Sequence, residues 1–169
     1  MVKKVSIILL TMIFLFVGLN SSLSEKKLKP GTVITKTVTI PGNKAWTNTG
    51  IEVRPQDSIT ITASGHVYFN EDESSKIDPN GYRQDHYQSD YSTSDFNYCG
   101  DPYEQWAHAA LIGEVGNSKF LVGTKRVLKG KNGFLYLGIN DCSFTEKYYK
   151  NSGSFKAIIK VVIGEFRKK

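Results

Sequence analysis

Residues 58–64, Ser-Ile-Thr-Ile-Thr-Ala-Ser, decide the fold class. Ile59 and Ile61 alternate with Thr60 and Thr62, so an extended chain places the isoleucines on one side and the threonines on the other. A period of two residues predicts a half-buried β-strand. We therefore expect Ile59 and Ile61 to face the core.

The same pattern recurs on both sides of this segment. In residues 32–40, Val38 and Ile40 alternate with Thr37 and Thr39. Short runs bounded by Gly, Asn or Pro predict further extended segments at 51–53, 66–69, 109–115, 119–122, 133–139 and 154–163. The sequence contains no convincing amphipathic helix. It predicts an all-β fold, an antiparallel β-sandwich or jelly roll.

The N-terminus has the pattern of a secretory signal. Lys3 and Lys4 precede the apolar run 5–19, and small residues follow at the place where a signal peptidase cleaves. The apolar run is shorter than a bilayer requires. We expect residues 1–24 to be a signal peptide, residues 25–169 to form a single domain, and the product to be periplasmic or extracellular. An uncleaved N-terminal anchor is the alternative.

Composition argues against several classes of function. The formal net charge is +6, and much of it lies at the two ends of the chain. No basic stripe with interleaved aromatic residues is visible, so we expect no nucleic-acid partner. The three histidines, which include His66 and His108, show no short-spaced pair that indicates zinc. No nucleophile elbow is present and nothing selects a pair of catalytic carboxylates, so we do not expect an enzyme.

Two cysteines in an exported chain predict one disulfide, between Cys99 and Cys142. This bond would join two polar loops, 71–108 and 141–153. Two free thiols are the alternative.

The 71–108 loop is rich in aromatic and acidic residues. Its aromatic side chains suit three roles: packing within the loop, a platform for a sugar ring, or a protein-binding patch. Tyr103 and Trp106 are the candidates to face a sugar, because they approach the strand expected from residue 109.

Residues 140–155 open with an Asn-Asp pair and close with Asn-Ser-Gly-Ser-Phe. Asp141, Asn151 and the carbonyl groups between them are hard oxygen donors of the kind that calcium prefers. A turn closed by hydrogen bonds from Asp141 and Asn151 is the alternative.

Three stretches of the sequence resemble the PA-I galactophilic lectins, a family of calcium-dependent galactose-binding lectins. They are Trp46-Thr47-Asn48-Thr49-Gly50-Ile51 with 57–65, Ala110-Leu111-Ile112-Gly113-Glu114-Val115-Gly116, and Tyr136-Leu137-Gly138-Ile139-Asn140-Asp141 with 151–155. The likeness covers roughly residues 41–164 and implies a jelly-roll sandwich of galactose-binding-domain-like type. In that family, calcium bridges protein oxygens to sugar hydroxyls.

The resemblance implies a calcium site and a sugar site. Asp141 corresponds to the carboxylate that contacts both calcium and sugar, and Asn151 to the second of two adjacent asparagine ligands. Phe69 and Thr145 correspond to the residues that supply backbone carbonyls. The first asparagine is replaced by Lys150, whose ammonium group has no lone pair for a metal.

The family's His-Pro-x-Gln sugar contact is echoed by His86 and Gln88, without the proline and one residue shorter. We therefore expect a secreted protein that binds a glycan or glycoconjugate through loops 141–151 and 71–108, with Ca²⁺ as the implied cofactor. The alternative is a secreted protein-interaction module that keeps the fold without calcium or sugar. The sequence leaves the oligomeric state open, a homo-oligomer included.

Overall fold

The structure is a computed structural model that describes residues 28–68, 76–82, 103, 106–141 and 151–165. The described part of the chain is all β, with no helix. Within that part, no helical segment has the length and apolar character needed to cross a membrane.

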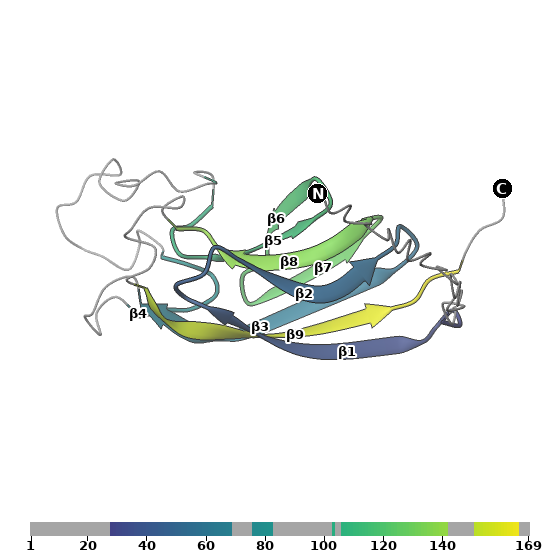
Figure 1. The fold of residues 1–169 in the computed structure, drawn as a ribbon, viewed down its shortest axis with the longest axis horizontal. Helices are drawn as coiled ribbons and strands as arrows, with labels where there is room; N and C mark the ends of the chain where they lie inside the picture. The colour runs from purple at the N-terminus through teal and green to yellow at the C-terminus, as the bar shows by residue number, and fades with distance from the viewer. Residues whose placement is uncertain (1–27, 69–75, 83–102, 104–105, 142–150, 166–169) are drawn as a thin grey trace, which may run out of the picture.

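The described residues form two antiparallel sheets (Figure 1). The five-stranded sheet has the order β1-β9-β3-β4, and β7 also pairs with β3. Its strands are β1 (Val33–Pro41), β9 (Ser152–Val162), β3 (Ser58–Tyr68), β4 (Lys76–Ile77) and β7 (Lys125–Lys129). β7 pairs with the first half of β3 and β4 with its last two residues, so both lie on the edge of β3 that β9 leaves open.

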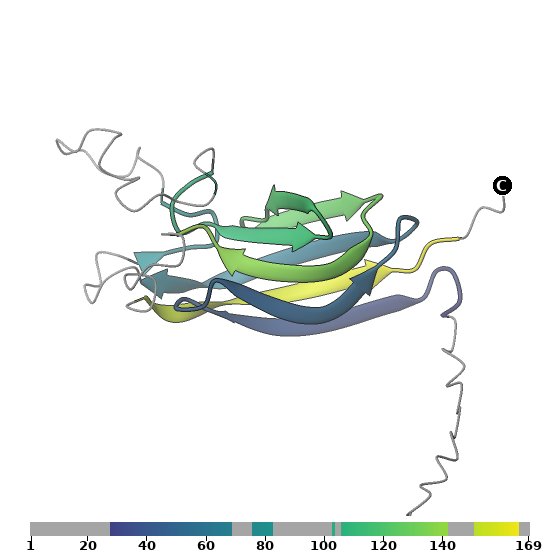
Figure 2. The same cartoon turned by 45° about the horizontal axis from the view of Figure 1, so that its top comes forward.

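The four-stranded sheet has the order β2-β8-β5-β6. Its strands are β2 (Trp46–Val53), β8 (Gly133–Ile139), β5 (Leu111–Val115) and β6 (Ser118–Leu121). Figure 2 shows this sheet lying over the five-stranded one as a second layer.

One continuous core fills the space between the sheets. Ile59, Ile61 and Phe155 contribute fully buried side chains from the five-stranded sheet, and Leu135 and Leu137 do so from the other. Burial of such side chains stabilises a fold by about 2 kcal/mol each. The expected β-sandwich is therefore confirmed, as is the inward orientation of Ile59 and Ile61.

The strand boundaries follow the sequence pattern with two additions. β3 continues to Tyr68 as one strand instead of two extended segments, and β2 begins at Trp46 instead of Ile51. The sequence did not indicate β4 or β7. In β7 only Leu128 is buried, so the alternation that marks a strand is reduced to a single residue.

Gly138 shows how tightly β2 and β8 pack, and it provides a stability test. A Cβ atom at this position would overlap the Ala45 carbonyl oxygen and lie 2.9 Å from Cε3 of Trp46. Because the obstacle is partly backbone, Gly138→Ala is expected to destabilise the fold by about 2 kcal/mol. Urea unfolding measures this change. Glu52→Ala, at an exposed position on β2, is the control, and equal midpoints for the two variants would contradict the packing argument.

Candidate functional site

Asn140 and Asp141 follow the last residue of β8, at one end of the sandwich. The Asn140 N–H donates to the Ala110 carbonyl (2.9 Å), and its own carbonyl accepts from the Ala109 N–H (2.6 Å). These bonds extend the pairing of β8 with the chain before β5. The Asp141 N–H then donates to the Ile139 carbonyl (3.0 Å), which closes a tight turn. The side chains of Asn140 and Asp141 point from this turn toward different partners.

The Asn140 side chain is fully buried and holds the segment that contains Tyr103 and Trp106. Its Oδ1 accepts from the Tyr103 N–H at 3.2 Å. Its Nδ2 lies 3.0, 3.1 and 3.2 Å from the carbonyl oxygens of Tyr103, Trp106 and Ala107. Two amide hydrogens are thus shared among three acceptors. The Asn140 side chain thus satisfies backbone groups that would pair with a neighbouring strand if they lay in a sheet.

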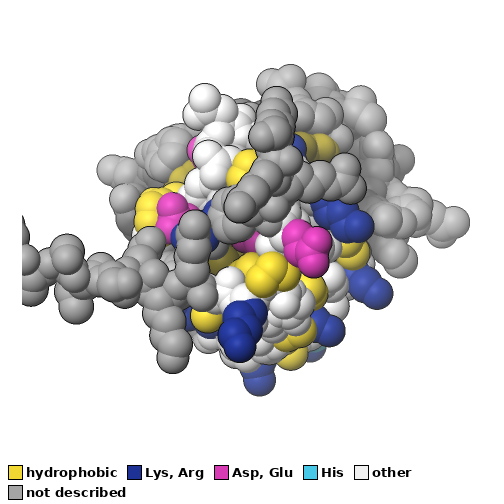
Figure 3. All heavy atoms as spheres, turned by 90° about the vertical axis from the view of Figure 1, so that its right-hand side faces the viewer, with side chains coloured by type: hydrophobic (Ala, Val, Ile, Leu, Met, Phe, Trp, Pro, Cys, Tyr) yellow, Lys and Arg dark blue, Asp and Glu magenta, His cyan; other side chains and the backbone are white. Residues whose placement is uncertain are grey.

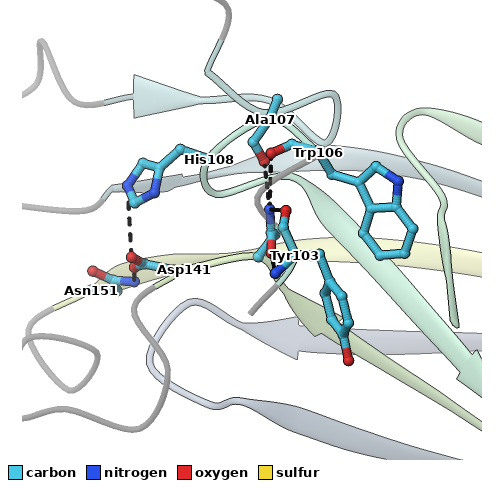
Figure 4. A network of polar contacts seen from close by, with 7 residues as sticks. Tyr103, Trp106, Ala107, His108, Asp141 and Asn151 are labelled. Carbon is cyan, nitrogen blue, oxygen red and sulfur yellow. Dashed lines mark hydrogen bonds and ion pairs between the residues drawn. The ribbon is translucent and has the colours of Figure 1, made fainter. Parts of the chain in front are cut away.

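Asp141 meets residues from two other parts of the chain (Figure 4). Asn151, the residue before β9, donates an Nδ2–H to Asp141 Oδ2. His108 Nε2 lies 3.6 Å from Asp141 Oδ1 and forms an ion pair when the imidazole is protonated. Asp141 and Asn151 are only 2% and 4% exposed. Because a buried carboxylate is costly unless it has polar or charged partners, these contacts stabilise it in place.

The backbone around His108 is fixed on both sides. The His108 carbonyl accepts from the Tyr82 N–H at 2.7 Å, in an isolated β-bridge between the two residues. The next residue, Ala109, has a φ of 56°, the left-handed region that residues with a Cβ rarely adopt. Strained residues of this kind persist where the surrounding structure holds them, often at functional sites.

The side chains brought together match the donor types of a calcium site. Asp141 offers carboxylate oxygens and Asn151 an amide oxygen, both preferred by calcium. In the structure Asn151 turns its nitrogen toward Asp141, and a half-turn of the amide exchanges nitrogen for oxygen without changing its shape. Among the described residues no group of three or more His, Cys, Asp or Glu side chains converges to hold a metal. Asp141 and Asn151 are therefore the side-chain oxygen donors that the described part of the chain brings together here for a calcium ion.

Several expected site residues lie outside the described part of the chain. These are the two carbonyl donors, the family sugar contact, the disulfide pair and the lysine that replaces asparagine: Phe69, Thr145, His86, Gln88, Cys99, Cys142 and Lys150. For these residues the sequence-based expectations stay predictions.

Tyr103 and Trp106 pack against each other, with ring centroids 4.8 Å apart and planes tilted by 43°. Lys119 of β6 places its Nζ 5.3 Å from the centroid of the Tyr103 ring. Interaction with the Tyr103 side chain, helped by the charge of Glu114, raises the pKa of Lys119 above its ordinary value. Figure 4 shows both aromatic rings directed away from His108, Asp141 and Asn151. The structure thus separates an aromatic pair from an Asp-Asn-His cluster, with Asn140 connecting the two.

The comparison with solved structures adds one finding. The fold is similar to that of a domain described as "EclA N-terminal domain; PllA-like lectin", with a TM-score of 0.52 and 18% sequence identity. The match covers 75% of this chain and 95% of that one. The chain has the fold of a lectin domain. No protein-family model matches the chain, and no curated protein matches its sequence. The lectin-like fold expected from the sequence is supported, whereas membership of the PA-I lectins in particular is not shown.

Sequence reasoning missed two residues of this candidate site. His108 showed no partner by spacing, yet it lies beside Asp141, which is far away in the chain. Asn140 was read only as part of an Asn-Asp pair, because hydrogen bonds from an amide to backbone carbonyls leave no pattern in the sequence.

Proposed function

We propose that the protein binds a glycan or glycoconjugate at the end of the sandwich where Asp141, Asn151 and His108 meet. One observation carries the proposal: a carboxylate and an amide, ten residues apart, converge in a nearly buried position beside an imidazole. Sugar hydroxyls both donate and accept, so they suit a site that presents acceptors and donors together. The likeness of the fold to a lectin domain supports the same proposal.

We further propose that calcium is held there by Asp141 and Asn151. When bound, the ion would accept oxygen ligands from sugar hydroxyls as well as from protein. Asp141 supplies the negative charge of this donor pair, and Asn151 supplies a neutral oxygen. The proposed activity is equilibrium binding and includes no chemical reaction.

A second candidate is a protein-interaction module without calcium or sugar. The observation that favours it is that Asp141 already has Asn151 and His108 as partners. A carboxylate with such partners is stable without a metal. Lys150 in the sequence favours it too, because a cation beside the ion weakens metal binding.

A glycan array tests the two candidates. The protein is applied once with millimolar calcium and once with a chelator. We expect a group of related glycans to be bound in calcium and lost, or weakened at least roughly tenfold, in chelator, because the ion supplies shared ligands. Equal signals in both conditions would support glycan binding and contradict the proposed role of calcium. An array without signal in either condition would favour the interaction module.

A further inference from the structure

The five-stranded sheet is basic along its whole width. Its strands contain no Asp or Glu. They carry instead these lysines and one arginine: Lys36, Lys76, Lys125, Arg126, Lys129, Lys156 and Lys160. The other sheet differs, since β2 and β5 contribute Glu52 and Glu114. Figure 3 shows Lys and Arg side chains gathered over the lower half of the molecule, where Figure 1 places β1, β9 and β3.

Four of these lysines share the outer face of the sheet and lie on the two strands that flank β3. Residues paired across an antiparallel sheet point to the same face. Lys125 pairs with Thr62 and Lys129 with Ser58 on one side of β3. On the other side, Lys156 pairs with Ser64 and Lys160 with Thr60. Because Ile59 and Ile61 of β3 are buried, the four β3 partners and their lysines face outward.

The register arranges the four lysines in a zigzag. In order along β3 they follow as Lys156, Lys125, Lys160 and Lys129, on alternate sides of the strand. Each step advances by two residues, roughly 7 Å, and crosses two strand spacings, roughly 10 Å. The positive charges thus form two parallel rows with β3 between them.

The outer face of β3 between the two lysine rows presents small hydroxyl side chains. They are Ser58, Thr60, Thr62 and Ser64, all exposed or half-buried. A hydroxyl both donates and accepts; Thr62 donates weakly to the Ile158 carbonyl (3.5 Å) and keeps its acceptor capacity. Two exposed apolar side chains complete the face. Val127 lies across β3 from Lys160, since both pair with Thr60, and Ile158 lies across β3 from Lys125, since both pair with Thr62. They are 53% and 43% exposed.

We propose that this face binds a linear acidic polysaccharide, one that carries sulfate or carboxylate groups, along β3. The lysine rows complement acidic groups on both sides of such a chain, and the serine and threonine hydroxyls bond its sugar hydroxyls. Val127 and Ile158 contact the apolar C–H faces of the sugar rings. This site lies on the outer face of the sheet and does not depend on Asp141 or on calcium.

The face suits a linear polysaccharide better than two other polyanions. A bilayer surface is bound by protruding aromatic or long aliphatic side chains, and here the apolar residues are short and β-branched. Single-stranded nucleic acid is bound by aromatic side chains on which its bases stack; among the described residues of β3, only Tyr68, beyond the lysine rows, offers one. Duplex DNA is usually read by an element that enters a groove, which a flat sheet face lacks.

Binding to immobilised dextran sulfate tests the proposal, with neutral dextran, duplex DNA and phosphatidylglycerol vesicles as parallel probes. Lys125, Lys129, Lys156 and Lys160 are changed together to Ser. We expect this variant to bind dextran sulfate at least roughly tenfold more weakly than the wild type at low salt. The control changes Lys29, Lys44, Lys119 and Lys131 to Ser, removes the same charge outside the five-stranded sheet, and should lose less than roughly threefold. The Asp141→Asn variant should bind dextran sulfate like the wild type.

A second variant avoids dependence on the quadruple change. Thr62→Glu keeps every lysine and places a carboxylate between the lysine rows, so it should also weaken binding to dextran sulfate. Melting curves establish that this variant and the quadruple lysine variant are folded. Equal losses in the lysine variant and its control would show that only net charge matters and overturn the proposal. No binding to dextran sulfate by the wild type would overturn it as well. If the wild type bound vesicles or DNA more tightly than dextran sulfate at equal probe charge, the proposal would be overturned and that probe would identify the class of partner.

Discussion

Asn140→Asp is expected to destabilise the fold by roughly 3 kcal/mol, although the two side chains have nearly the same shape. The reason is the set of partners around Asn140 Nδ2. Three carbonyl oxygens lie within 3.2 Å of this donor, and aspartate would present an acceptor to all three. The oxygen at the Oδ1 position could still accept from the Tyr103 N–H, but the other carboxylate oxygen would be buried against carbonyl oxygens without a donor or a compensating charge. In urea unfolding, the midpoint should fall by roughly 1.5 M.

The control for this change is Asn48→Asp. Asn48 is exposed, and its side-chain oxygen accepts from the Gly50 N–H at 2.8 Å, a role that a carboxylate keeps. It should change the midpoint little. Trp106 fluorescence, measured in a Trp46→Phe background, reports whether the segment held by Asn140 opens before the rest of the fold. Unchanged midpoint and unchanged Trp106 emission in Asn140→Asp would contradict the role assigned to Asn140.

Much of the fold could be predicted from the sequence because a two-residue period is a local property. The alternation in β3 and in β1 places Ile59, Ile61 and Ile40 in the core, as the structure confirms. β7 could not be predicted in the same way, since it is a short strand that pairs with β3 and is rich in lysine and arginine. Its identity as a strand is fixed by its partner and not by its own composition.

Only the site residues that lie at the two ends of one loop could be predicted from the sequence. Asp141 and Asn151 are ten residues apart at the two ends of such a loop, and the structure brings their side chains together. His108 reaches them only because the chain before β5 lies beside the end of β8, a consequence of strand order. The lysine rows could not be predicted for the same reason, because Lys125 and Lys160 are placed on opposite sides of β3 by the strand register.

Calcium is expected to raise the melting temperature of the wild type, and Asp141→Asn is expected to abolish most of that increase. A ligand that binds the folded state alone, at a hundred times its dissociation constant, stabilises by roughly 2.7 kcal/mol. For a domain of this size the gain is on the order of 10 °C. Asn at position 141 removes the one carboxylate assigned to the ion, so the difference between calcium and chelator should largely disappear.

The matched control is Asp78→Asn. It removes one negative charge from an exposed turn, where Asp78 accepts from the Asn80 N–H at 2.7 Å, and it should keep the full calcium increment. Lys150→Asn should increase the increment, because it removes a cation and restores the paired asparagines of the PA-I lectins. Identical melting of wild type and all three variants in calcium and in chelator would show that the 141–151 segment is a turn without a metal.

Asp141 is proposed to be part of a glycan site, and one measurement tests this role most directly. Wild type and Asp141→Asn are applied side by side to the same glycan array in calcium, after thermal melting has shown that both are folded. We expect the glycans bound by the wild type to be lost, or bound at least roughly tenfold more weakly, by the variant. Equal signals from the two proteins on the same glycans would contradict it and place the glycan site elsewhere on the molecule.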